Sequence, residues 1–365
     1  MSDISIALDD ARGIFRPGDV VTGHVVFSLS EPKKSKSLIV ALDGKSYTHW
    51  ETAELVSFVA TGSGAQTPIY RNCLHSMSDV YINGSMTLWS PPGSADSGHI
   101  PDGQHRFPFS FTLPPTCLHS FEGQYGYIRY TLSARIDRPW KFDHKASKAF
   151  TVVTSLPLPH SSLSPVSASE EKKTGLLKRG VVAIDSAKGG YRPGDEVIVE
   201  AMVANGTGKE ITKIEFRLVE LSSYTAKKDF EDTKKEKREK IKEEVRAERR
   251  VVNQYEESIH IDRGSSTTFS RKIPVPSIAP TFDNCPIIKV SYVVEVKVTV
   301  KGTIKDDSAS VDLPIVIGTG MMAEDSDAPP SYEESIFGAG ATKEEKEAPV
   351  FAPYYPYYTK FAPAP

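Results

Sequence analysis

The chain has 365 residues, of which 39% are hydrophobic and 25% are charged, and its formal net charge is −3. That length suits two domains of ordinary size, and the low hydrophobic fraction suits two small β domains with polar tails. The near-neutral charge argues against a nucleic-acid or anionic-membrane binder, and three scattered cysteines argue against a disulfide framework.

Residues 1–155 predict a domain made of short strands. Near its start, Phe15-Arg16-Pro17-Gly18-Asp19 predicts a type II turn, because proline fixes φ at the second position and glycine accepts a positive φ at the third. The clearest strand alternates apolar and polar residues from Phe107 to Leu113 and ends at Pro114-Pro115. Many short strands and no convincing amphipathic helix indicate a β-sandwich.

Residues 156–173 predict an exposed linker, because Leu156–Lys173 is rich in proline and serine and ends in charged residues. Residues 174–317 then repeat the plan of the first domain. The turn recurs 176 positions later as Tyr191-Arg192-Pro193-Gly194-Asp195. At a shift of 162 positions, Val275-Pro276 repeats Leu113-Pro114 and Tyr292 repeats Tyr130. The fold class predicted is therefore all-β, with two tandem immunoglobulin-like β-sandwiches.

A charged insertion, residues 227–250, interrupts the second domain. Opposite charges recur at a spacing of four residues, as in Glu231/Lys235 and Glu236/Lys240, and little else in the stretch could be buried. This pattern predicts a solvated excursion, helical or disordered, between two strands. The alternative is a basic surface for a membrane or a partner, which would need a stronger one-sided excess of lysine and arginine.

No catalytic motif is present: the sequence has no Gly-x-Ser-x-Gly, no phosphate-binding glycine loop and no His-Glu-x-x-His. We therefore expect no enzyme activity, no cofactor and no metal. Two Cys-x-His pairs, Cys73/His75 and Cys117/His119, could together supply a tetrahedral zinc site. Buried cysteines that act as small hydrophobic residues are the preferred interpretation. Six basic residues could form a phosphate-binding face, although separate solvated side chains are favoured: Arg71, Arg106, Arg129, Arg135, Arg138 and Lys141.

The C-terminal tail, residues 318–365, is acidic and then rich in proline and tyrosine, which predicts disorder in the free chain. It contains Pro329-Pro330-Ser331-Tyr332, a Pro-Pro-x-Tyr motif. Consecutive prolines preform a polyproline II segment that fits an aromatic groove, while the tyrosine fills a neighbouring pocket, as in the ligands of WW domains. Further on, Pro353-Tyr354 and Pro356-Tyr357 predict a weaker second contact, or else an end with no partner.

These motifs together resemble the α-arrestins, the arrestin domain-containing adaptor family. The resemblance runs across both domains and the tail, and rests on the two Arg-Pro-Gly-Asp turns and on the segments His105–Pro114, Ser120–Tyr130, Ala134–Trp140, Cys285–Tyr292, Leu313–Gly318 and Pro329–Tyr332. It implies an arrestin fold, in which two curved β-sandwiches are joined by a hinge. The family often carries two Pro-Pro-x-Tyr motifs, whereas only Pro329–Tyr332 is intact here.

The resemblance also implies a non-enzymatic adaptor. Pro329, Pro330 and Tyr332 would recruit a HECT-type ubiquitin ligase through its WW domains, and the β domains would engage membrane cargo such as receptors or transporters. Ubiquitination, endocytosis and endosomal sorting of that cargo would follow. With no signal-peptide core and no apolar run long enough to span a membrane, we expect a cytoplasmic protein, associated peripherally with the plasma membrane and endosomes through its cargo. The alternative is an arrestin-like coat or sorting scaffold, similar to a retromer subunit, that recruits no ligase.

Overall fold

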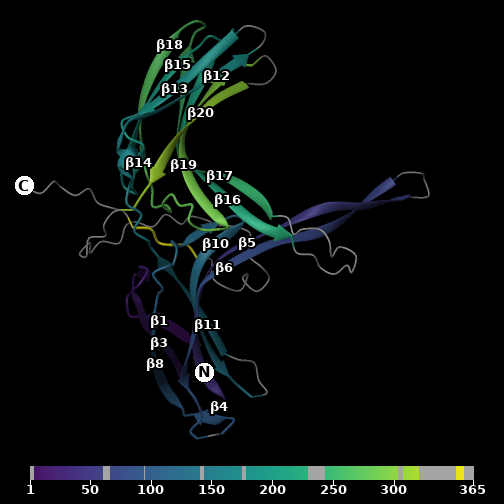
Figure 1. Cartoon of the computed structure of the whole chain (residues 1–365), viewed down its shortest axis with the longest axis vertical. Helices are drawn as coiled ribbons and strands as arrows, with labels where there is room; N and C mark the ends of the chain where they lie inside the picture. The colour runs from purple at the N-terminus through teal and green to yellow at the C-terminus, as the bar shows by residue number, and fades with distance from the viewer. Residues whose placement is uncertain are drawn as a thin grey trace, which may run out of the picture.

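The computed structural model of the protein describes residues 4–60, 66–93, 95–139, 144–174, 178–228, 243–302, 307–319 and 351–356. Two bodies built of strands lie end to end along the long axis, and a two-stranded ribbon extends sideways from their junction (Figure 1). Within the described ranges, one short 3-10 helix, η1 (His160–Leu163), is the sole helical element. No helix in this part of the chain is long and apolar enough to cross a bilayer.

The strands of the N-terminal body are β1 (Ser5–Leu8), β2 (Ile14–Phe15), β3 (Val20–Leu29), β4 (Lys33–Ser35), β5 (Ser37–Ala60), β6 (Gln66–Trp89), β7 (Gly98–Ile100), β8 (Gly103–Thr112), β9 (Phe121–Gly123), β10 (Gly126–Asp137) and β11 (His144–Val152). The order β1-β3-β8 forms one sheet, and β6-β5-β10-β11-β2 forms part of a larger one, with β9 beside β10. Every second residue of β3, from Val21 to Leu29, is buried, so the apolar faces lie between the sheets.

The strands of the C-terminal body are β12 (Val166–Thr174), β13 (Lys178–Ser186), β14 (Gly190–Tyr191), β15 (Glu196–Ala204), β16 (Ile211–Lys228), β17 (Glu243–Ile261), β18 (Ser266–Pro274), β19 (Ile288–Val300) and β20 (Asp307–Ile317). The order β12-β13-β15-β18 forms one sheet, and β14-β20-β19-β16 belongs to the second, with β17 beside β16. The period-two pattern predicted for residues 290–300 is confirmed, since Val290, Tyr292, Val294, Val296, Val298 and Val300 are all buried.

The repeated turn has the predicted geometry in both bodies. The N–H of its fourth residue donates to the carbonyl of its first, at 3.0 Å in Arg16–Asp19 and 2.9 Å in Arg192–Asp195. The third residues, Gly18 and Gly194, have φ of +92° and +93°, which residues with a side chain rarely adopt. The aspartate at the end of each turn also accepts a hydrogen bond from the backbone N–H of the arginine that opens it.

The later landmarks of the sequence repeat contact these turns directly. Gly18 N–H donates to the carbonyl of Leu113 at 3.0 Å, and Gly194 N–H donates to that of Val275 at 2.9 Å. The carbonyls of Asp19 and Asp195 accept a hydrogen bond in return from the same two residues. Two repeats that lie far apart in the sequence are thus one structural unit, present once in each sandwich.

The two sandwiches share a sheet. Strand β16 of the C-terminal body pairs with β6 of the N-terminal body at Lys227–Ser76 and Lys228–His75, which joins the larger sheets into one of eleven strands. We call this junction the seam. The backbone near the end of β20 also returns to it, because Thr319 N–H donates to the Leu156 carbonyl at 2.9 Å and Leu156 N–H donates to Thr319 Oγ1 at 2.7 Å.

The predicted linker, residues 156–173, is only partly a linker. Residues 166–174 form β12 and pair along their whole length with β13. Val166 and Ala168 pack against the core, and this alternation is hidden in the sequence by the serines and glutamates around it. The second sandwich therefore begins before residue 174.

The charged insertion, residues 227–250, also differs from its prediction. Strand β16 continues to Lys228, and Glu243–Arg250 belongs to β17, so the predicted helical or disordered excursion is wrong for these two ends. Residues 229–242 lie outside the described residues. In a strand the charges find partners across the ladder: Lys227 pairs with Glu243 at 3.5 Å, and Tyr224 Oη donates to Glu248 at 2.9 Å.

Candidate functional site

The structure separates the predicted tail contacts into two groups. Four lie outside the described residues: Pro329, Pro330, Tyr332 and Tyr357. The other three, Pro353, Tyr354 and Pro356, belong to segment 351–356, which lies against the body at the seam (Figure 1). The prediction that the tail has little to bury is wrong for this segment, because Tyr355 belongs to the hydrophobic core.

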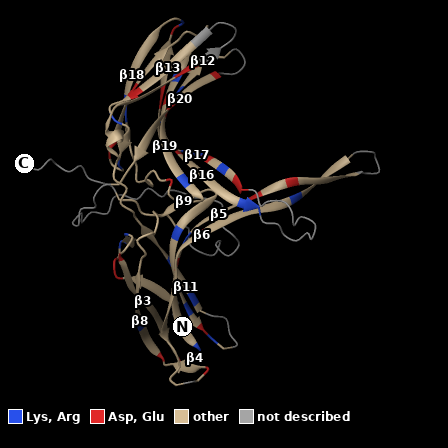
Figure 2. Ribbon diagram, viewed as in Figure 1, with Lys and Arg blue, Asp and Glu red and all other residues tan. Residues whose placement is uncertain are grey.

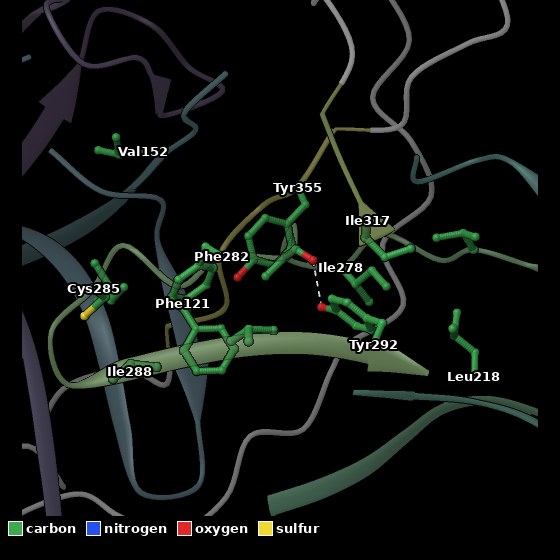
Figure 3. Packing of buried hydrophobic residues seen from close by; sticks show 14 of the residues in the cluster. Phe121, Val152, Leu218, Ile278, Phe282, Cys285, Ile288, Tyr292, Ile317 and Tyr355 are labelled. Atoms are coloured by element: carbon green, nitrogen blue, oxygen red, sulfur yellow. Dashed lines mark hydrogen bonds between the residues drawn. The ribbon is translucent and has the colours of Figure 1, made fainter. Parts of the chain in front are cut away.

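Tyr355 lies between the two sandwiches. Its side chain is 8% exposed, and its Oη donates a hydrogen bond to the Ser120 carbonyl at 3.0 Å. The ring stacks on His119, with centroids 5.3 Å apart and planes 12° from parallel. Figure 3 shows Tyr355 in one group of side chains with Phe282 and Tyr292 of the C-terminal sandwich. A tail residue thus fills an interdomain position.

The backbone of the same segment binds both sandwiches. Tyr354 N–H donates to Thr151 Oγ1 on β11 of the N-terminal sandwich, at 2.9 Å. On the other side, Ser277 Oγ, in the connection between β18 and β19, donates to the Tyr355 carbonyl. Pro353 is buried as well. Segment 351–356 therefore bridges the two bodies.

His119 forms the floor under Tyr355 and is neutral. It is 4% exposed, and its Nδ1 accepts a hydrogen bond from Thr154 N–H at 3.1 Å, which places the ring proton on Nε2. Burial lowers the pKa of His119 to about 3, because the cationic form would lose its hydration. The floor of the site is therefore an uncharged aromatic surface.

An ion pair between a buried carboxylate and a half-buried arginine lies on the C-terminal side of the site. Glu220 on β16 is 2% exposed and accepts hydrogen bonds from Arg250 at 2.7 Å, Tyr292 Oη at 3.0 Å and Ser222 Oγ at 3.2 Å. Burial first, and then the charge of Glu220, raise the pKa of Tyr292 well above its ordinary value. The same causes act on Tyr355, whose pKa is raised well above its ordinary value by burial, Glu220 and Glu122. Both phenols are therefore neutral.

Aromatic side chains from both sandwiches close the rest of the seam. Phe121 meets Phe282 edge to face at 5.8 Å, and Tyr125 meets Tyr224 in the same way at 5.7 Å. The guanidinium of Arg246 lies over the Tyr125 ring at 5.1 Å. The segment Ser120–Tyr130 thus supplies part of the N-terminal side of the interdomain interface.

The ribbon that leaves the seam forms a second surface, which we call the arm: residues 51–60 and 66–74, where β5 and β6 pair only with each other among the described strands. No charged residue lies between Glu54 and Arg71, and Figure 2 shows the outer part of the arm in tan. Neighbouring residues face opposite sides of a ribbon, so apolar side chains lie on both of its faces. The exposed ones are Leu55, Val56, Phe58, Val59, Ile69 and Tyr70.

The Cys-x-His pairs do not come together as a zinc site. His75 stacks on Trp50 and bonds to Thr52 Oγ1 at 2.9 Å, whereas His119 contacts Thr154 and Tyr355. Within the described ranges, no group of three or more His, Cys, Asp or Glu side chains is placed to hold a metal ion. Cys73 and Cys117 are both buried, as preferred from the sequence.

Of the six basic residues that could have formed a phosphate-binding face, Lys141 lies outside the described residues, and three others are paired separately. Arg129 makes a bidentate salt bridge with Glu122 at 2.7 and 2.8 Å, and Arg106 bonds to His24 at 3.1 Å. Arg71 lies 3.7 Å from Glu54. Since these three belong to different pairs, they do not combine into one anion site.

Tyr355, Ser277 and the role of His119 in this interdomain site were not predicted from the sequence. One signal was present: Phe351–Tyr358 is dense in aromatic residues, in an otherwise polar tail. Nothing in the sequence distinguishes a tyrosine that docks onto its own chain from one that binds a partner, because the docking surface is assembled from residues more than 70 positions away.

Two sandwiches joined at a seam define the chain as a protein of the arrestin fold. Its residues 4–158 match the model of the arrestin (or S-antigen) N-terminal domain, and residues 181–320 match that of the arrestin C-terminal domain. It is 30% identical over 332 residues to arrestin domain-containing protein 17 of Caenorhabditis elegans, which covers 86% of this chain and 70% of the relative. Human arrestin domain-containing protein 4 is 27% identical over 319 residues, 85% of this chain and 69% of the relative. Mouse arrestin domain-containing protein 1 is 27% identical over 367 residues, 96% and 73% respectively.

The chain belongs to the arrestin family and, within it, to the α-arrestins, the arrestin domain-containing proteins. Its arrestin-domain relatives support an adaptor role for the chain, as in the rest of the family. The predicted fold class, two tandem β-sandwiches of the arrestin type, is confirmed.

Proposed function

We propose that this chain is a non-enzymatic adaptor that brings a HECT-type ubiquitin ligase to membrane cargo. Pro329, Pro330 and Tyr332 bind a WW domain of the ligase, while the sandwiches bind a receptor or transporter. Holding both raises the effective concentration of the ligase at the cargo, which promotes ubiquitination, endocytosis and endosomal sorting. The protein then works in the cytoplasm, at the plasma membrane and at endosomes, through its cargo.

One observation carries the ligase half of this proposal. A Pro-Pro-x-Tyr motif follows two arrestin domains and begins ten residues after Thr319, where the C-terminal sandwich ends at the seam. The motif is thus attached at a short chain distance from the C-terminal sandwich.

Replacing Tyr332 with alanine is expected to weaken WW-domain binding by about 30-fold or more, the effect of losing an aromatic residue that contributes about 2 kcal/mol. Titration of the purified full chain with a WW domain measures this. Ser331→Ala, which changes the variable position of the motif, is the matched control and should bind as the wild type does.

The cellular consequence is measured by ubiquitination of co-expressed membrane proteins. The wild type and Ser331→Ala should increase it, and Tyr332→Ala should not. Equal ubiquitination with Tyr332→Ala would contradict ligase recruitment and would favour the coat or sorting-scaffold function instead.

The arm is the surface that we assign to cargo. Val56 and Phe58 are 56% and 55% exposed, and the outer part of the arm, which carries no charge between Glu54 and Arg71, loses little hydration when it is buried against a membrane protein. In Figure 2, by contrast, Lys, Arg, Asp and Glu are scattered along the strands of both sandwiches.

The double variant Val56→Ser/Phe58→Ser is expected to lower recovery of cargo with the adaptor several-fold, because it removes apolar area that only the bound state buries. Its unfolding midpoint should stay that of the wild type. Ile198→Ser/Met202→Ser removes similar residues, 44% and 47% exposed, from β15 of the other sandwich and should leave cargo recovery unchanged. Equal losses for the two variants would show that the arm has no special part in binding.

A further inference from the structure

Segment 351–356 occupies a site that is already formed by the body. Ser120 is fixed on both sides by β11, since its N–H donates to the Val152 carbonyl and its Oγ accepts from Val152 N–H, both at 2.9 Å. The remaining polar group of Ser120, its carbonyl, points to the Tyr355 hydroxyl. Without Tyr355, a buried carbonyl would lose this hydrogen bond and the His119 ring would lose its cover.

The site also has a defined chemistry. The Ser120 carbonyl requires a hydrogen-bond donor, which the Tyr355 hydroxyl supplies, and the neutral His119 ring stacks on an aromatic side chain. Burial first, and then the carboxylates of Glu220 and Glu122, raise the pKa of the Tyr355 hydroxyl and disfavour negative charge there, and Arg250 offsets this only in part. An unmodified tyrosine fits all three conditions, whereas phenylalanine lacks the donor and phosphotyrosine adds about two negative charges.

The segment binds as an extended peptide. Its Tyr354 N–H reaches Thr151, its Tyr355 carbonyl reaches Ser277, and the flanking Pro353 is buried while Pro356 is half-buried. Prolines restrict the free chain to extended conformations, so the segment loses less conformational entropy on docking than an ordinary tail would.

We propose that the seam contains a peptide-binding site for an extended Pro-Tyr-Tyr-Pro segment with an unmodified second tyrosine, and that its ligand is residues 353–356 of the same chain. The bound segment holds the two sandwiches together, since it contacts Thr151 and Ser277 at once. The proposal does not depend on the ligase, because the docking involves this chain alone.

The test uses full-length protein and a fluorescent peptide of residues 349–358. In the wild type the attached segment competes at an effective concentration on the order of 1 mM, so the peptide should give no anisotropy change. The full-length Tyr355→Ala variant leaves the site open and should bind the peptide. Tyr255→Phe, at an exposed tyrosine on β17, is the control and should behave as the wild type does.

Peptide variants then test the chemistry of the site on Tyr355→Ala protein. Phenylalanine at the position of Tyr355 should weaken binding about tenfold, the usual effect of one lost buried hydrogen bond. Phosphotyrosine there should abolish binding, and equal binding of the phosphopeptide would overturn the proposed specificity. Equal peptide uptake by wild type and Tyr355→Ala would overturn the claim that the chain fills its own site.

Two further measurements keep the proposal testable if Tyr355→Ala does not fold, or if the tail docks on a second copy of the chain. Hydrogen exchange of the wild type should show the Tyr354 amide protected, and Thr151→Val, which removes its acceptor, should speed that exchange at least tenfold. An unprotected Tyr354 amide in the wild type would contradict docking. A dimer that dissociates in Tyr355→Ala would show that the ligand comes from a second copy and would overturn the intramolecular assignment.

Discussion

Replacing Arg250 with alanine is expected to lower the free energy of unfolding by about 3 kcal/mol, because it leaves the Glu220 carboxylate buried without its cation. Glu220 is 2% exposed, and two hydroxyl donors, Tyr292 and Ser222, would remain. Burial by itself would lower the pKa of Arg250, yet the pKa is raised because the attraction of Glu220 exceeds that cost. Urea unfolding of both proteins at neutral pH measures the difference.

The neighbouring Arg249 is the matched control. Its side chain is 47% exposed and pairs with Asp312 at 2.9 Å, so Arg249→Ala should cost no more than about 1 kcal/mol. A double variant, Glu220→Leu/Arg250→Met, removes both charges and should recover most of the stability lost in Arg250→Ala. If Arg249→Ala and Arg250→Ala cost the same, the ion pair is not buried in solution.

Acidification to about pH 5 is expected to remove about 2 kcal/mol of stability through His119 alone. Its pKa is about 3 in the folded chain and about 6.5 in the unfolded chain. As the pH falls below about 6.5, the unfolded chain therefore binds a proton that the folded chain does not. The stability that a neutral His119 allows is therefore present above about pH 6.5 and decreases as the pH falls toward 3. The variant His119→Gln cannot titrate, and its carbonyl can still accept from Thr154 N–H. Its loss of stability between about pH 7.5 and about pH 5 should be smaller by the same amount.

His260 provides a control of the opposite sign. It is exposed, and its hydrogen bond with Glu210 raises its pKa, so its contribution is present at low pH and is lost as the pH rises. His260→Gln should therefore not reduce the loss of stability on acidification. If His119→Gln loses as much stability on acidification as the wild type does, His119 is not buried as the structure has it.

The sandwich architecture could be predicted because it depends on local patterns that recur. The third turn position requires a positive φ, which glycine accepts, and the structure has it at Gly18 and Gly194. Alternating apolar residues indicate a half-buried strand, and the structure has one from Val290 to Val300. Charged strands are harder. In Glu243–Arg250, opposite charges at a spacing of four residues suit a helix, but the same residues suit a strand whose partners lie across the ladder. Only the pairing with β16 decides between the two.

The interdomain site could not be predicted for a different reason. His119 and Ser120 precede a short strand, Thr151 is the last residue but one of another, and Ser277 lies in a connection between two strands. No single stretch of sequence therefore contains a recognisable motif. The site exists because the seam brings these three places together. The Pro-Pro-x-Tyr motif is the opposite case, because four consecutive residues are enough to recognise it. It lies outside the described residues.

The continuity of β5 and β6 has a mechanical consequence. Each strand has 24 residues, which at about 3.3 Å per residue is about 80 Å of unbroken backbone, running from the N-terminal core out to the end of the arm. A force on the outer end of the arm therefore acts through a lever whose fulcrum is the pairing of β6 with β16. In the proposed function, cargo bound to the arm therefore applies torque to the seam, where the tail segment also lies, as shear between strands.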